Sequence, residues 1–174
     1  MKLLAILLSS LLITSCSLSG SSDVNYERYS LVEDTVPTAF NTDYGISLDL
    51  YGVLKDGGVV LQTSDVSLRP AKNHRWASDL ASQLKILLTQ ELINNSVNTA
   101  YKFNVTVTKF QGDLVGNVYI SANCIVFNGK NQILDKNIVY KAKQDADGYD
   151  ALVAKLKEGW VESSKDLANE VLAR

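Results

Sequence analysis

Few side chains in this sequence have the types and spacing that catalysis or metal binding requires. His74 is the single histidine of the 174 residues, so a histidine-rich metal cluster or a catalytic triad lacks the ligands it needs. Asp145 and Asp147 are close in sequence, but they lie in a polar stretch without the spacing of a calcium-binding loop. Gly57 and Gly58 precede a predicted strand, whereas a phosphate-binding glycine loop opens a helix. We therefore expect no catalytic residue, no metal site and no bound cofactor, in a protein that is not an enzyme.

Cys16 is the residue for which the sequence predicts a specific covalent reaction. The chain begins with a charged residue, Lys2, and an apolar run that is too short to span a bilayer, which is the layout of a secretory signal. Bacterial lipoprotein signals end in an apolar residue, two small residues and a cysteine whose thiol receives a diacylglycerol before cleavage. Ile13-Thr14-Ser15-Cys16 resembles that motif. We therefore expect Cys16 to carry a diacylglycerol and an N-acyl chain.

The predicted cleavage divides the chain into three parts. Residues 1–15 are expected to be a lipoprotein signal peptide. Residues 16–24 are expected to be a lipidated tether, because Ser19-Gly20-Ser21-Ser22 is typical of a flexible linker rather than of a buried N-terminal helix. Residues 25–174 are long enough for a single domain with its own core. An aspartate directly after the lipidated cysteine resembles an inner-membrane retention signal. This chain has Ser17 at that position, so we expect an outer-membrane anchor and a domain that faces the periplasm.

Charge and cysteine content narrow the range of partners. The chain has 17 Lys and Arg against 19 Asp and Glu, a net charge of −2, which does not indicate a surface for nucleic acid. Cys16 is used by the predicted lipid and Cys124 is alone in a predicted strand, so we expect no intrachain disulfide. No apolar run of about 20 residues follows Cys16, so attachment to the membrane is expected to be by lipid only.

Hydrophobic periodicity predicts short strands followed by a helix in the first half of the domain. Pro70 is expected to end the strand pattern. Near Arg75 the hydrophobic period changes from two residues to nearly four, which predicts a helix. Asn73 is its expected N-cap and Asn94-Asn95 its expected end, and Gln83 lies outside its apolar stripe. The strands predicted by alternation cover residues 26–32, 46–51, 59–63 and 65–69.

The second half of the sequence predicts an antiparallel meander and a closing helix. Residues 101–110 and 115–127 alternate on either side of a turn expected at Gln111-Gly112-Asp113. Asn128-Gly129 is a strong hairpin signal before a third strand at residues 133–140. We therefore expect an α+β fold, a mostly antiparallel sheet with two amphipathic helices packed on it. The closing helix carries its apolar residues near one face: Leu152, Leu156, Trp160, Leu167 and Val171.

The predicted start of the first helix holds the candidates for structural and binding roles. Trp76 and Leu80 are four residues apart and are expected to fix the helix onto the sheet. Arg75 is expected to point another way and is less easily explained by packing, so we predict an interface or anion contact for it. His74 and Arg69 are assigned to the same candidate binding surface.

The stretch His74-Arg75-Trp76-Ala77-Ser78-Asp79-Leu80 resembles the PqiC/YmbA lipoproteins, which are also called ABC-type transport auxiliary lipoproteins. The resemblance covers almost the whole chain, although Tyr26 and Tyr29 are spaced apart where the family usually has adjacent aromatic residues. It implies an outer-membrane-anchored partner of a protein of the mammalian-cell-entry type, in a system that moves lipid between two membranes. It also implies a homo-oligomeric ring.

Other assignments remain open on the residues alone. A carrier would hold a lipid or another small ligand between the sheet and its helices, but the Leu- and Trp-rich helix faces look sufficient to fill that space. An envelope lipoprotein that activates a cell-wall enzyme is a third alternative, and we favour the docking module. For a ring, residues 59–68 and 133–140 are candidate sheet edges, and the first has no lysine between Gly57 and Arg69 to prevent pairing.

Overall fold

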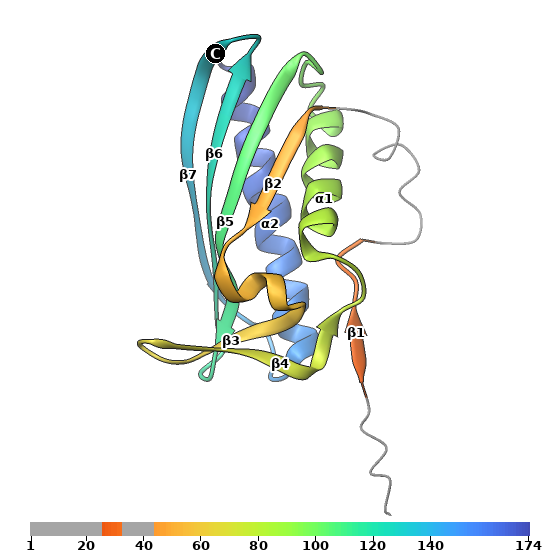
Figure 1. The fold of residues 1–174 in the computed structure, drawn as a ribbon, viewed down its shortest axis with the longest axis vertical. Helices are drawn as coiled ribbons and strands as arrows, with labels where there is room; N and C mark the ends of the chain where they lie inside the picture. The colour runs from red at the N-terminus through yellow and green to blue at the C-terminus, as the bar shows by residue number, and fades with distance from the viewer. Residues whose placement is uncertain (1–25, 33–43) are drawn as a thin grey trace, which may run out of the picture.

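The computed structural model describes residues 26–32 and 44–174. The predicted signal peptide and tether, residues 1–15 and 16–24, lie outside the described residues. The described chain has the predicted α+β fold, in which a seven-stranded sheet carries two helices on one of its faces (Figure 1). Its elements are β1 (Glu27–Tyr29), β2 (Ile46–Leu50), the 3-10 helix η1 (Gly52–Asp56), β3 (Gly58–Ser64), β4 (Ser67–Trp76), α1 (Leu80–Asn94), β5 (Tyr101–Asp113), β6 (Asn117–Asn128), β7 (Asn131–Lys143) and α2 (Tyr149–Leu172).

The sheet is mostly antiparallel, as predicted, but it also contains parallel pairs. Its strand order is β1-β4-β3-β5-β6-β7, and β2 pairs with β5. The pairs β3–β4, β5–β6 and β6–β7 are antiparallel, whereas β1–β4, β2–β5 and β3–β5 are parallel. Parallel neighbours need a crossover connection, so the strands that form them are separated in sequence and local periodicity does not indicate their pairing.

One side of β5 is shared by β2 and β3. β2 lies beside residues 103–107 of β5, and Val60 to Gln62 of β3 lie beside residues 111–113. β3 therefore has β5 on one side and β4 on the other, and Val60 is buried. The prediction of a free edge over residues 59–68 is wrong for β3, because the parallel pairing with β5 covers it.

The connection from β4 to α1 differs from the sequence prediction. Pro70 does not end the strand, because β4 continues to Trp76. Over residues 67–73, β3 is the only described strand that pairs with β4, so Pro70 lies on an edge of the sheet, where proline is tolerated. Asn73 is not the N-cap, because the helix begins later, at Leu80. Asp79 is the N-cap, and its carboxylate accepts a hydrogen bond from the main-chain N–H of Ser82 at 2.8 Å.

The turn after β5 is also later than the predicted one. β5 continues through Gly112 to Asp113, where β3 pairs with it. A Cβ atom on Gly112 would lie 2.7 Å from Leu152 Cδ1, so this glycine allows the close approach of α2 rather than a turn. The predicted hairpin between β6 and β7 is confirmed, since Asn128 pairs with Asn131 across a two-residue loop.

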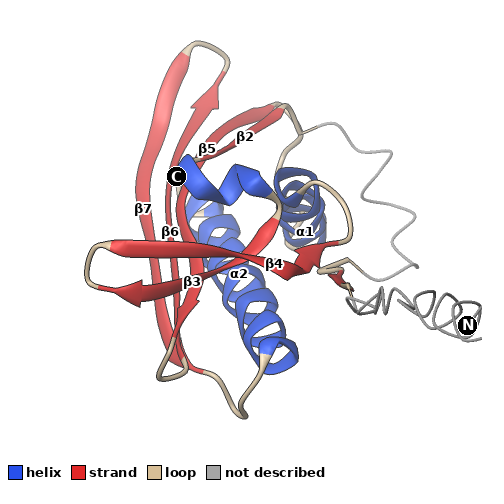
Figure 2. Ribbon diagram, turned by 60° about the horizontal axis from the view of Figure 1, so that its bottom comes forward, coloured by secondary structure: helices blue, strands red, loops and turns tan. Residues whose placement is uncertain are grey.

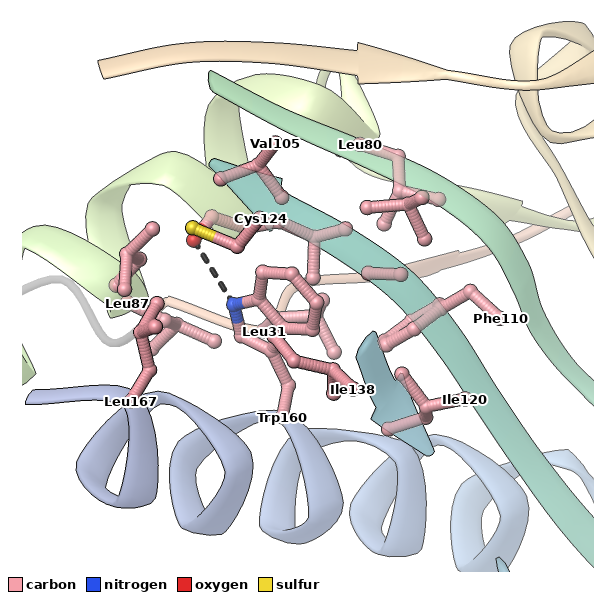
Figure 3. Close-up of a cluster of buried hydrophobic side chains, with 14 of the residues drawn as sticks. Leu31, Leu80, Leu87, Val105, Phe110, Ile120, Cys124, Ile138, Trp160 and Leu167 are labelled. Atoms are coloured by element: carbon pink, nitrogen blue, oxygen red, sulfur yellow. Dashed lines mark hydrogen bonds between the residues drawn. The ribbon is translucent and has the colours of Figure 1, made fainter. Parts of the chain in front are cut away.

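The core lies between the sheet and the two helices (Figure 3). Figure 2 shows α1 and α2 side by side against the curved strands β5, β6 and β7. The predicted apolar faces of both helices are buried. No helix in the described ranges combines the length and the apolar character needed to span a bilayer. The most buried helix residues are Leu84, Leu88 and Leu92 of α1, with Leu152, Leu156, Trp160 and Leu167 of α2.

Candidate interaction surface

The pairing of β1 with the end of β4 assembles a polar cluster around His74. Glu27 lies opposite His74 in the parallel register, and the Nδ1 atom of His74 is 2.9 Å from Glu27 Oε2. The hydroxyl of Tyr29 donates a hydrogen bond of 2.6 Å to the same carboxylate oxygen and lies 3.1 Å from His74 Nδ1. The hydrogen bond from Tyr29 is the main reason why the pKa of Glu27 lies below its ordinary value. The cluster therefore joins β1 to β4 through side chains as well as through main-chain pairing.

The start of α2 covers this cluster. The rings of His74 and Tyr149 are stacked, with their centroids 3.8 Å apart and their planes 12° from parallel. Burial raises the pKa of Tyr29, and the neighbouring carboxylates of Glu27 and Asp150 raise it further. Burial also raises the pKa of Tyr149, and the positive charge of Arg69 opposes that shift. His74 and Arg69, both predicted interface residues, are thus gathered around Tyr149.

Arg75 lies in a separate cleft and on a strand, not at the helix start that the sequence predicts. Its Nη2 atom donates a hydrogen bond of 2.7 Å to the main-chain oxygen of Asp56. Arg28 lies directly opposite Arg75 in the β1–β4 register, an unfavourable arrangement of like charges unless an anion is near. Lys55 lines the same cleft, which has a volume of about 290 Å³. Three cationic side chains therefore converge on one hollow.

Carboxylates are present in this cleft but do not neutralise it. Asp56 and Asp79 line it together with the three cations, and one oxygen of Asp79 is occupied by the hydrogen bonds from the main-chain N–H and the hydroxyl of Ser82. Within the described part of the chain no salt bridge joins Arg28, Lys55 or Arg75 to a carboxylate. The arrangement suits an anionic group from another molecule.

Trp76 and Leu80, the two predicted structural residues, are each 3% exposed. Trp76 is the last residue of β4, and its ring centroid is 5.8 Å from that of Phe110 in β5. Leu80 is the first residue of α1. Their spacing of four residues is therefore not one turn of a helix, because the chain between them leaves the sheet and enters α1.

Of the two cysteines, the structure describes Cys124 but not Cys16. Cys16, the predicted lipidation site, lies outside the described residues. Cys124 is fully buried in β6, and burial raises the pKa of its thiol to about 12. Over residues 26–32 and 44–174, no group of three or more His, Cys, Asp or Glu side chains could hold a metal ion.

The sequence does not identify Glu27, Tyr29 or Tyr149 as neighbours of His74. Glu27 and Tyr29 reach it only through the parallel pairing of β1 with β4, and Tyr149 reaches it only because α2 returns across the sheet. The one sequence signal for this surface is the run from His74 to Leu80 itself.

Comparisons with known proteins place these residues in a family context. The family model described as ABC-type transport auxiliary lipoprotein component matches residues 47–168. The chain is 30% identical over 185 residues to the intermembrane transport lipoprotein PqiC of Escherichia coli strain K12, a match that covers 98% of each chain. The PqiC of Shigella flexneri is similar to the same extent.

Solved structures share the fold. A crystal structure of an uncharacterised protein has a TM-score of 0.71 and 28% identity, over 84% of this chain and 99% of that chain. A crystal structure of a Xanthomonas campestris protein has a TM-score of 0.62 over 82% of this chain and 90% of that chain. Its identity is 10%, so this likeness concerns the fold alone.

Proposed function

The chain belongs to the family of ABC-type transport auxiliary lipoprotein components, and from this premise we propose that it is a non-catalytic, outer-membrane subunit of a system that moves lipid between two membranes. Acyl groups on Cys16 hold it in the outer membrane. Its domain faces the periplasm and docks a partner of the mammalian-cell-entry type. The observation that carries this proposal is the similarity to PqiC, an intermembrane transport lipoprotein, over 98% of both chains.

The cleft of Arg28, Lys55 and Arg75 is the docking point that we assign to the partner. Its cations have no carboxylate partner in the described part of the chain, so an acidic segment of the partner would relieve the repulsion between Arg28 and Arg75. The hydrogen bond to the Asp56 carbonyl holds the guanidinium of Arg75, a lining residue of this cleft, and so reduces the entropy that Arg75 loses on binding.

The packing of the core favours a docking module over a lipid carrier. A carrier needs an apolar cavity between the sheet and the helices. Large side chains occupy this space: Phe103, Phe110 and Trp160 are at most 1% exposed, and the ring of Trp160 meets the ring of Phe110 edge-on at 6.3 Å. An acyl chain would have to displace them.

The proposed ring would form through the sheet edges that the described strands leave unpaired. Among these are the outer edge of β7 and the outer edge of β4 over residues 67–73. Two different edges on one subunit suit a head-to-tail contact that closes into a ring. Light scattering on the purified lipoprotein should give a mass several times that of one chain, and a monomer at every concentration would contradict the ring.

The anchor is tested by changing Cys16 to Ala. The tagged parent chain should separate with the outer membrane on a density gradient and should incorporate labelled palmitate. Cys16→Ala should lose the label and the processing in front of residue 16. A Cys124→Ala variant is the matched control, because Cys124 is buried and should keep the label. Palmitate on the Cys16→Ala chain would contradict the predicted anchor.

The docking point is tested by reversing one charge. The tagged chain should recover the mammalian-cell-entry-type protein of the same genome from solubilised membranes. Arg75→Glu should reduce this recovery at least about tenfold, because a buried charge pair at an interface becomes a repulsion. Lys130→Glu, on the exposed turn between β6 and β7, is the control of equal charge change. Equal recovery by both variants would place the partner elsewhere on the domain.

A further inference from the structure

Exposed apolar side chains are concentrated on two turns of the described chain. Val66, at the tip of the β3–β4 hairpin, is 93% exposed, and Leu68 beside it is 44% exposed. Leu114 and Val115, in the turn between β5 and β6, are 68% and 67% exposed. We call these four residues the apolar tips. Large apolar side chains at this level of exposure contribute little to the core, so their apolar surface is available for contact with another molecule.

The two turns are neighbours in space. The parallel pairing of β3 with β5 places Gln62, two residues before the end of β3, beside Asp113, the last residue of β5. A hollow of about 340 Å³ lies between them, and Leu114 and Val115 line it together with residues 62–65. In Figure 1 both turns lie in the lower part of the molecule. The apolar tips therefore form one surface.

Hydrogen bonds hold the β5–β6 turn in this outward conformation. One oxygen of the Asp113 carboxylate accepts hydrogen bonds from the main-chain N–H groups of Val115 and Asn117, at 3.0 and 2.8 Å. The other accepts from the Asn117 amide at 2.7 Å and from the Tyr119 hydroxyl at 3.2 Å. Leu114 and Val115 are thus presented by an ordered turn, which lowers the entropy lost when they are buried.

The described chain begins in the same part of the molecule. Tyr26 directly precedes β1, and β1 lies in the lower part of Figure 1, the part in which both turns also lie. The residues between Cys16 and Tyr26 span at most about 35 Å even when fully extended. A lipid on Cys16 therefore holds the start of β1 within this distance of the bilayer, and β1 is paired with β4, the second strand of the β3–β4 hairpin.

We propose that the apolar tips insert into the lipid surface in which Cys16 is anchored and so fix the orientation of the domain on the membrane. This rests on the lipid anchor of the proposed function. The charges around the tips are mixed: Arg69 and Lys72 lie on β4, and Asp65 and Asp113 lie at the two turns. The attraction is therefore hydrophobic rather than electrostatic, and a zwitterionic surface is sufficient for it.

The proposal is tested with the full-length acylated lipoprotein in phosphatidylethanolamine and phosphatidylcholine vesicles that contain brominated acyl chains. A bimane probe is placed on Leu114→Cys or, as the control, on Val139→Cys. Val139 is 77% exposed on β7, outside both turns, and lies opposite Ser121 of β6. Cys124 is fully buried and does not compete for the probe. We expect bromine quenching to be at least about twofold stronger at position 114 than at 139, and unchanged when phosphatidylglycerol is added.

A second pair of variants shows whether the tips act together. Val115→Asp, combined with the probe at position 114, should reduce quenching to the level seen at position 139. Val139→Asp should leave it unchanged. A chain that floats with the vesicles but is quenched equally at both positions overturns the inference alone and favours a protein partner for the tips. A chain that does not float overturns both the inference and the anchor of the proposed function.

Discussion

Trp160 and Leu84 are joined by a buried hydrogen bond of 3.0 Å from the indole Nε1 to the main-chain carbonyl oxygen of Leu84. The two residues are 76 positions apart in sequence, and they connect α2 to α1 (Figure 3). The same indole meets the ring of Phe110 in β5, so one side chain connects both helices and the sheet.

Replacing Trp160 by Phe should lower the free energy of unfolding by about 1 to 3 kcal/mol, because it removes the hydrogen bond and leaves unfilled volume in the core. Denaturant unfolding of the purified chain measures this change. Tyr51→Phe is the control, because Tyr51 is 70% exposed and its change should stay within about 0.5 kcal/mol. A Trp160→Phe chain as stable as the parent would show that the hydrogen bond contributes nothing to holding α2 on α1.

Trp76→Ala should be more severe. Truncation of a buried tryptophan costs about 3 to 5 kcal/mol, a large share of the 5 to about 15 kcal/mol that stabilises a typical domain. The thermal midpoint should fall sharply, as measured by calorimetry or circular dichroism. Tyr51→Ala removes a side chain of similar kind from the surface and should change the midpoint little. If the two variants melt alike, Trp76 does not fix α1 to the sheet.

Gly159→Ala should destabilise the domain although alanine is the better helix former. A Cβ atom at position 159 of α2 would collide with the ring of Tyr140 in β7. The helix propensity of alanine offers about 1 kcal/mol, and the displacement of a packed ring costs about 1 to 3 kcal/mol, so we expect a net loss. In a Tyr140→Ala background the collision is absent, and Gly159→Ala should become neutral or stabilising. If Gly159→Ala lowers the free energy of unfolding equally in the parent and in the Tyr140→Ala background, the Tyr140 ring is not what the new Cβ atom collides with.

Local patterns predict the elements of this fold better than their neighbours in the sheet. Alternation along β6 and the Asn128-Gly129 signal are properties of adjacent residues, and the hairpin forms where they predict it. The extension of β4 past Pro70 depends instead on β1 and β3 beside it. The continuation of β5 to Asp113 depends on β3 in the same way. Such long-range pairings carry no local signal.

Gln83 shows the same limit within a helix. Its polar side chain places it outside the predicted apolar stripe, yet it is 2% exposed. Its Oε1 accepts a hydrogen bond of 2.7 Å from the main-chain N–H of Leu31, and its Nε2 donates one of 3.1 Å to the main-chain oxygen of Ser78. The segment after β1 provides a partner that α1 alone does not reveal. The interface candidates show the same limit. The sequence alone suggests that Arg75 makes a contact, but only the pairing of β1 with β4 shows that Arg28 lies opposite it.

The turn that presents Leu114 and Val115 should weaken in acid. Burial by itself raises the pKa of Asp113, but the hydrogen bonds from Asn117, Val115 and Tyr119 outweigh it, so the pKa lies below its ordinary value of 3.8. A carboxylate whose pKa is lowered on folding stabilises the folded state fully above its unfolded pKa. This contribution is lost as the pH falls through the folded pKa.

Asp113→Ala should therefore cost about 1 to 2 kcal/mol at pH 7, a modest value for charge-assisted hydrogen bonds because the side chain is only partly buried. The difference between parent and variant should shrink as the pH falls below 3.8, because the carboxyl of the unfolded parent is protonated first and that of the folded parent at a lower pH, after which the charge no longer favours folding. Chemical unfolding at a series of pH values measures this difference. Asp65→Ala, at the exposed tip of the neighbouring hairpin, is the control, because it removes a carboxylate that is not part of the Asp113 hydrogen-bond network. A deficit for Asp113→Ala that stays constant from neutral pH to pH values well below 3.8 would mean that the ionised carboxylate does not hold the turn.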